Sequence, residues 1–354
     1  MPERLLVVGP AWVGDMVMSQ SLFIRLAEHR PDLQLDVLAP GWSMPLLERM
    51  PQVNQVIEMP LGHGEFGFLE RRRLGRSLRA RDYRQAIVLP RSFKSALVPY
   101  FAGVPRRTGY RGEMRFGLLN DMRALDKRRL TQTVQRYVSL GLPADAVQPP
   151  DVPEPCLRVD PDNQRRLISA LSLNPDRPIV AIMPGAEYGP AKCWPLEHFA
   201  SVARSLVERE CLVWIMGSER DRAAGETIIK QAGVTARDGR GSGELRNLCG
   251  QTTLTDAVDL LALADFALSN DSGLMHVAAA VGCYVVAVYG SSTPDYTPPL
   301  NANSTVHYLR LDCSPCFERD CPLGHLNCLR GISPDSVLQS LDHAVREPRV
   351  QPHA

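Results

Sequence analysis

A loop that ends in an acidic residue follows the first apolar segment of the chain. Residues 9–15 have the sequence GPAWVGD and come directly after the apolar run 4–9. The loop is neither a G-x-G-x-x-G dinucleotide turn nor a phosphate-binding P-loop, because no Gly-Lys-Ser/Thr follows. A carboxylate at the end of a strand suits a general base, which makes Asp15 a candidate for proton abstraction. The alternative is that Asp15 only caps the following helix.

A second loop combines small residues with one positive charge. Residues 184–195 (PGAEYGPAKCWP) follow the first apolar segment of the second half. Small residues let the backbone approach a ligand, and Lys192 adds a point charge just before a helix that Pro195 would begin. The pattern predicts either a grip for a diphosphate or a surface loop with a solvated lysine.

A third loop, residues 269–276 (SNDSGLMH), links an apolar strand to a helix. Asp271 or Ser272 can cap that helix, and its first-turn amides then form an anion site. Ser272 and His276 are four residues apart and share a helix face. The alternative is a plain helix cap above a core histidine.

Basic residues gather between positions 91 and 129, where ten Lys or Arg stand against three acids. The preceding segment 66–82 contains five arginines between positions 71 and 79. Arginine pairs bidentately with phosphate and carboxylate, so this surface suits a phosphorylated acceptor or an anionic leaflet. The alternative is a solvated basic face.

Four cysteines stand close together near the C-terminus, at Cys313, Cys316, Cys321 and Cys328, with His325 among them. Clustered thiols in a cytosolic chain resemble a zinc or iron–sulfur site, although the spacing fits no standard zinc ribbon. We expect either a structural metal or reduced thiols here, and no catalytic role.

Strand-like and helix-like segments alternate in both halves of the chain. In the first half the expected strands are 4–9, 33–38, 53–59 and 86–89, and the expected helices are 16–29, 66–82 and 93–101. In the second half the expected strands are 178–183, 212–216, 266–269 and 284–289, and the expected helices are 195–208, 221–232, 253–264, 273–281 and 333–346. This order predicts two doubly wound α/β domains with parallel sheets, with ligands bound at the carboxyl ends of the strands in a cleft between the domains.

Composition places the domain boundaries in a proline-rich stretch. We expect a first Rossmann-like domain at 1–145, a linker at 146–162, a second Rossmann-like domain at 163–332 and a C-terminal helix and tail at 333–354. Within the linker, Asp160-Pro161-Asp162 matches the D-x-D metal motif superficially, but proline and cap chemistry favour a turn and a helix cap.

Length and charge exclude several classes of protein. The chain has 354 residues and a formal net charge of +1, so no global field attracts nucleic acid. No secretory signal or run of about 18 apolar residues is present, which predicts a cytosolic protein.

Taken together, these segments resemble the lipopolysaccharide heptosyltransferase II family, in glycosyltransferase family 9. The similarity spans nearly the whole chain, through residues 9–16, 60–64, 92–97, 108–115, 184–195, 270–280 and 289–299. It implies a GT-B fold and an inverting transfer of heptose from ADP-heptose to the heptosylated Kdo-lipid A core, with no metal needed for the chemistry. It also implies peripheral contact with the cytoplasmic face of the inner membrane.

The resemblance assigns roles to individual residues. It makes Asp15 the base and Lys192 a catalytic contact to the donor phosphates. It implies a donor site formed by Gly185, Ala186, Glu187, Lys192, Glu219, Asp271, Ser272, Gly273, Leu274 and His276. It implies acceptor contacts from Trp12, Lys94, Arg111 and Arg115. A heptosyltransferase I-like acceptor position, a nucleotide-dependent oxidoreductase and a silent sugar-nucleotide binder are the alternative functions; the missing G-x-G-x-x-G disfavours the oxidoreductase.

Overall fold

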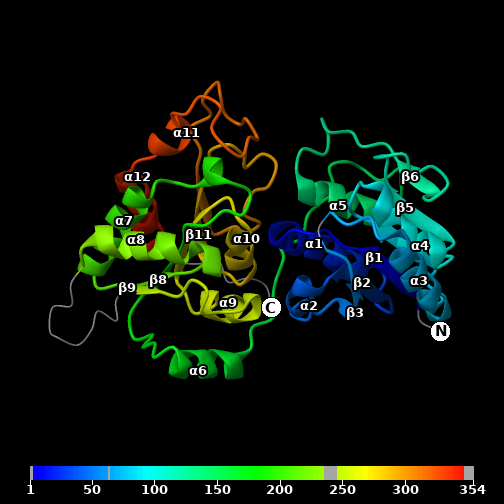
Figure 1. The fold of residues 1–354 in the computed structure, drawn as a ribbon, viewed down its shortest axis with the longest axis horizontal. Coiled ribbons are helices and arrows are strands. Elements are labelled where there is room, and N and C mark those ends of the chain that lie inside the picture. The colour runs from blue at the N-terminus through cyan, green and yellow to red at the C-terminus, as the bar shows by residue number, and fades with distance from the viewer. Residues whose placement is uncertain (1–2, 63, 235–244, 347–354) are drawn as a thin grey trace. The chain divides into compact units, whose positions relative to one another are not determined.

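The computed structural model describes residues 3–62, 64–234 and 245–346. His63, part of the segment 60–64 noted above, lies outside the described residues, as does the tail after Arg346. The chain divides into two compact units, Met1–Pro155 and Cys156–Ala354, each with its own six-stranded sheet (Figure 1). The division falls inside the proline-rich stretch 146–162.

The first unit has the strand order β3-β2-β1-β4-β5-β6, and every pairing is parallel. Its strands are β1 (Arg4–Val8), β2 (Gln34–Pro40), β3 (Val53–Met59), β4 (Gln85–Val88), β5 (Arg106–Tyr110) and β6 (Asp121–Arg123). Its α-helices are α1 (Val13–His29), α2 (Met44–Leu47), α3 (Phe68–Ser77), α4 (Leu97–Phe101) and α5 (Thr133–Gly141).

The second unit repeats this architecture with the order β12-β11-β10-β7-β8-β9, again wholly parallel. Its strands are β7 (Ile179–Met183), β8 (Leu212–Ile215), β9 (Leu245–Asn247), β10 (Phe266–Asn270), β11 (Tyr284–Val288) and β12 (Ser304–His307). Its α-helices are α6 (Pro161–Ala170), α7 (Leu196–Glu208), α8 (Arg222–Ala232), α9 (Leu254–Leu261), α10 (Gly273–Ala280), α11 (Asn327–Arg330) and α12 (Pro334–Arg346).

The central strands are apolar throughout because parallel sheets are covered on both faces. β7 and β10 are buried at every position. In both units the chain builds outward from one central strand and then returns to its other side, which places a switch point between β1 and β4 and another between β7 and β10. Crevices at such switch points are where open α/β sheets bind ligands.

One local prediction has a clear outcome. The Asp160 carboxylate accepts hydrogen bonds from the N–H groups of Asp162 and Asn163 and caps α6, as expected for a turn and cap. The basic block 91–129 contains β5 and the edge strand β6, where Arg106 and Arg123 both pair with Asp121. In the described part of the chain, no helix has the length and apolar character needed to cross a membrane.

Candidate active site at the strand ends

The switch point of the second unit brings together two of the three loops singled out in the sequence. Lys192 lies in the loop after β7, and Asp271 directly follows β10, the neighbouring strand. The Lys192 ammonium is 2.5 Å from a carboxylate oxygen of Asp271. The side chains are 18% and 5% exposed, so this ion pair is largely shielded from water.

A third strand end completes this cluster. Ser292, in the loop after β11, donates a hydrogen bond of 2.5 Å to the same oxygen of Asp271. The centre of the Tyr188 ring lies 5.2 Å from the Lys192 ammonium. Lysine has three N–H donors, so the ion pair with Asp271 leaves donors for a further anion.

Buried hydrogen bonds hold the Lys192 loop against β10. The side chain of Asn270, the last residue of β10, accepts from the Trp194 N–H at 2.9 Å and donates to the Pro184 carbonyl at 2.6 Å. The Trp194 indole N–H donates to the Ile332 carbonyl at 3.0 Å. Both ends of the loop are therefore fixed, which positions Lys192 before any ligand arrives.

The helix α10 begins beside this cluster. The Ser272 hydroxyl caps it by accepting from the Met275 N–H at 3.4 Å. The N–H groups of Gly273 and Leu274 precede the first intrahelical bonds, as at the start of any helix, and suit an anion.

His276 lies one turn further along α10 and is only 4% exposed. Burial, with a smaller effect of the Lys192 charge, outweighs the opposing charge of Asp271 and lowers its pKa to about 4. The ring is therefore neutral near pH 7.

The remaining donor candidates lie after β7 and β8. A side chain at Gly185 would place a Cβ 2.3 Å from the Asp221 carboxylate, so a larger residue would have to displace Asp221 where the two loops meet. Glu187 pairs with Arg220, and Glu219 pairs with Arg222, both at the surface. A hydrogen bond from Arg222 lowers the pKa of the Glu219 carboxyl. Ala186 is half-buried in the same loop.

In the first unit, the candidate residues again flank the switch point. Trp12 follows β1, is 43% exposed and occupies the N-cap of α1. Asp15 lies in the first turn of that helix and is half-buried. Lys94 follows β4, the neighbouring strand, and its ammonium donates to the Glu65 carbonyl at 3.0 Å.

One acceptor candidate needs correction. Arg115 is fully buried, and its guanidinium donates to the carbonyls of Pro90 and Tyr110 and to the Ser95 hydroxyl. Burial lowers the pKa of this group to about 10. Because its donors face its own chain, Arg115 holds the loops after β4 and β5 and does not present a surface to an acceptor. Arg111 is exposed and packs over the Phe116 ring at 5.8 Å.

Sequence reasoning missed Ser292 and Asn270 as members of the site. Their position supplied a signal, because each stands at or just after the carboxyl end of a strand next to the switch point.

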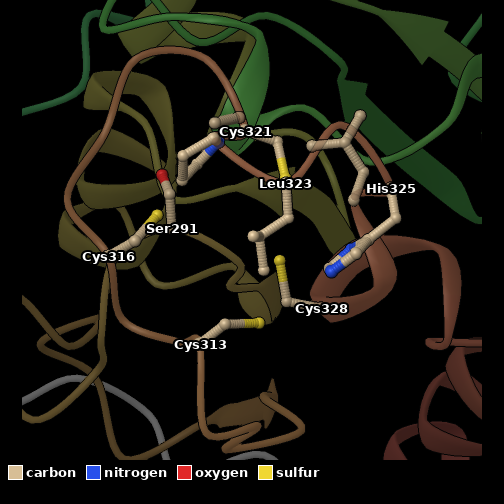
Figure 2. A pocket seen from close by; sticks show the side chains of 10 residues that line it. Ser291, Cys313, Cys316, Cys321, Leu323, His325 and Cys328 are labelled. Carbon is tan, nitrogen blue, oxygen red and sulfur yellow. The ribbon is translucent and has the colours of Figure 1, made fainter.

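The four clustered cysteines line one pocket in the second unit together with His325 (Figure 2). All nine cysteines of the chain are among the described residues, and none of them forms a disulfide.

Comparison with known proteins agrees with this architecture. Residues 71–327 match glycosyltransferase family 9 (heptosyltransferase). The chain is 45% identical over 344 residues to lipopolysaccharide heptosyltransferase 2 of Escherichia coli K12, covering 96% of this chain and 97% of that protein. It is 42% identical over 347 residues to lipooligosaccharide heptosyltransferase 2 of Haemophilus influenzae, covering 96% and 98%.

Among solved structures, E. coli ADP-heptose LPS heptosyltransferase II matches with a TM-score of 0.80 and 42% identity, covering 97% of this chain and 98% of that one. The two doubly wound units are thus those of a GT-B glycosyltransferase, as the sequence resemblance implied. The chain belongs to glycosyltransferase family 9, the heptosyltransferases.

Proposed function

We propose that this chain transfers L-glycero-D-manno-heptose from ADP-heptose to the first heptose of the lipopolysaccharide inner core, with inversion at the anomeric carbon. The observation that carries the proposal is the Lys192–Asp271–Ser292 cluster at the switch point of the second unit. The 42–45% identity to proteins named for this activity supports the choice of sugar and acceptor.

The second unit would hold the donor. The Lys192 ammonium and the first-turn amides of Gly273 and Leu274 supply donors for the diphosphate of ADP. Because Asp271 and Asn270 fix the Lys192 loop in advance, these donors need little rearrangement when charge develops on the leaving phosphate. Preorganised donors of this kind are usually the largest electrostatic contribution to a transfer reaction.

The first unit would supply the base. The acceptor hydroxyl oxygen bonds to the anomeric carbon of the donor, the bond from that carbon to the phosphate oxygen breaks, and ADP leaves. Asp15 takes the hydroxyl proton. In this scheme Asp15 holds the proton of the acceptor hydroxyl, and the departing ADP carries the negative charge that Lys192 and the α10 amides stabilise. The scheme therefore needs no metal ion.

The test is the variant Asp15→Asn, which keeps size and hydrogen bonding but removes the base. A positioned base contributes about 10²–10⁴-fold, so turnover should fall by that factor while ADP-heptose affinity, measured by calorimetry, stays near wild type. Asp32→Asn, at an exposed turn of the same unit, is the matched control. Turnover of Asp15→Asn within a few-fold of wild type would remove Asp15 as the base.

We also infer that the first unit contacts an anionic membrane surface, where a lipid-linked acceptor would lie. Phe66, Phe68 and Leu69 are 51%, 42% and 62% exposed at the start of α3. The Phe66 ring stacks on Phe68 at 6.2 Å, and the two arginines Arg73 and Arg76 are exposed on the same helix. Exposed aromatic groups beside arginines suit the interface of an anionic bilayer.

Vesicle sedimentation tests this surface. Replacement of Phe68 and Leu69 by serine should abolish binding to phosphatidylglycerol vesicles. Val147→Ser, an 87% exposed position of the same unit, should retain it. Equal binding by all three proteins, or none by wild type, would exclude a membrane role for this surface.

A further inference from the structure

Four thiols and an imidazole line one pocket inside a segment that has no regular structure. The pocket is bounded by Cys313, Cys316, Cys321 and Cys328, with His325 at its rim (Figure 2). Residues 308–326, between β12 and α11, form neither helix nor strand. Irregular segments longer than about 12–15 residues are uncommon inside compact domains, so this one needs an additional tie.

The chain turns tightly just after Cys321. Gly324 has φ +70° and donates its N–H to the Cys321 carbonyl at 3.0 Å. Cys321 and His325, on either side of this turn, line the same pocket as Cys313, Cys316 and Cys328.

All four thiols line the same pocket. Thiolates are the ligands that zinc and iron prefer, so a single cation in this pocket would have four cysteine ligands within its lining.

We propose that this pocket binds one tetrahedral, thiolate-preferring cation, Zn²⁺ or iron, through Cys313, Cys316, Cys321 and Cys328. Binding of one divalent cation forms four metal–sulfur bonds and releases one proton from each thiol that was protonated. Among the residues that the structure describes, no three side chains of His, Cys, Asp or Glu already have the grouping that holds a metal. The thiols therefore rotate about χ1 towards the centre of the pocket when the cation enters.

The segment that contains these cysteines contacts two loops of the candidate active site, the loop of Lys192 after β7 and the loop of Ser292 after β11. The Ala191 N–H, beside Lys192, donates to the Arg319 carbonyl at 2.9 Å. The Phe317 N–H donates to the carbonyl of Ser291, the neighbour of Ser292, at 2.7 Å.

Two further contacts tie the same loops. The Tyr188 hydroxyl donates to the Phe317 carbonyl at 2.5 Å, and the Ser314 hydroxyl donates to the Gly290 carbonyl at 2.5 Å. A Cβ at Gly189 would lie 2.7 Å from the Arg319 carbonyl oxygen, so the two segments are in close contact. A metal at the pocket would therefore position the donor loops without touching substrate; this second role rests on the proposed function.

The first experiment measures metal in the full-length protein purified under reducing conditions. Elemental analysis should find about one zinc or iron per chain, and it identifies which. Replacement of Cys321 and Cys328 by serine should remove the metal. Replacement of Cys156 and Cys211, which lie outside the pocket, should not. After chelation, added Co²⁺ should give the sulfur-to-cobalt charge-transfer bands of a tetrahedral thiolate site.

Substoichiometric metal together with no cobalt bands in folded wild-type protein would overturn the proposal, as would full metal content in the Cys321/Cys328 variant. Chelation of the wild type avoids any folding defect of the variants, and circular dichroism verifies that the chain stays folded. ADP affinity should then fall roughly tenfold, within the usual range of coupling between sites. Unchanged ADP affinity would refute the bracing role alone, and failure of heptose transfer would leave the metal measurement intact.

Discussion

Removal of the Lys192 ammonium separates its role in ligand binding from its role in folding. In Lys192→Ala, a diphosphate loses a charged donor, and a hydrogen bond to a charged group contributes about 1.5–3 kcal/mol. At about 1.4 kcal/mol per tenfold, ADP affinity should fall roughly 10- to 150-fold. The donor is already in place, because Asp271 holds it at 2.5 Å, so little of this loss should be recovered by rearrangement.

The same variant should also lose stability. Asp271 is 5% exposed and would retain only the Ser292 hydroxyl among the partners described above. Breaking a buried ion pair from one side costs about 3–5 kcal/mol, and partial exposure of Lys192 reduces this to about 1–3 kcal/mol. The double variant Lys192→Ala/Asp271→Asn removes the unpaired charge, so it should regain much of that stability while ADP binding stays weak.

Calorimetry with ADP and chemical denaturation measure these two effects independently. Lys230→Ala is the matched control, because Lys230 is exposed on α8 and distant in sequence from the site. It should leave both quantities unchanged. If Lys192→Ala bound ADP within twofold of wild type, the switch-point cluster would not be the diphosphate site.

Two further predictions concern buried groups. The pKa of His276 is lowered from 6.5 to about 4, so between these pH values the unfolded chain binds more protons than the folded protein. The contribution of His276 to the free energy of unfolding, on the order of 3 kcal/mol, is therefore complete above about pH 6.5 and declines as the pH falls towards 4. The stability difference between wild type and His276→Asn should therefore shrink on acidification, and a difference independent of pH would contradict the assignment. Arg115→Met should destabilise the protein by about 2–4 kcal/mol in denaturation, because several buried carbonyls lose a charged donor, whereas Arg111→Ala should change stability by less than about 0.5 kcal/mol. Equal effects of the two substitutions would refute the structural role of Arg115.

The central elements could be predicted because their burial dominates their sequence. β7 and β10 are continuous apolar runs, and the loops after them carry proline, glycine and capping residues that mark the strand ends. Position at a strand end then identified the Lys192 and Asp271 loops, which the structure joins by an ion pair. The confirmed cap at Asp160 rests on equally local chemistry.

The edge elements were missed for the converse reason. The edge strands β6 (DMR) and β9 (LRN) are short and polar, and edge strands have no continuous apolar pattern. The role assigned to Arg115 was wrong because burial of an arginine depends on tertiary packing that sequence charge does not report. The part of Ser292 in the cluster depends on strand order, since only the adjacency of β10 and β11 brings it to Asp271.

Transfer of heptose from ADP-heptose to purified acceptors tests the central claim most directly. Kdo2-lipid A carrying zero, one or two heptoses should be compared with wild-type protein, with product mass as the readout. We expect one heptose to be added to the acceptor that already carries one, with little product from the other two. Transfer to the acceptor without heptose would indicate the first-heptose reaction, and ADP binding with no product from any acceptor would contradict the account.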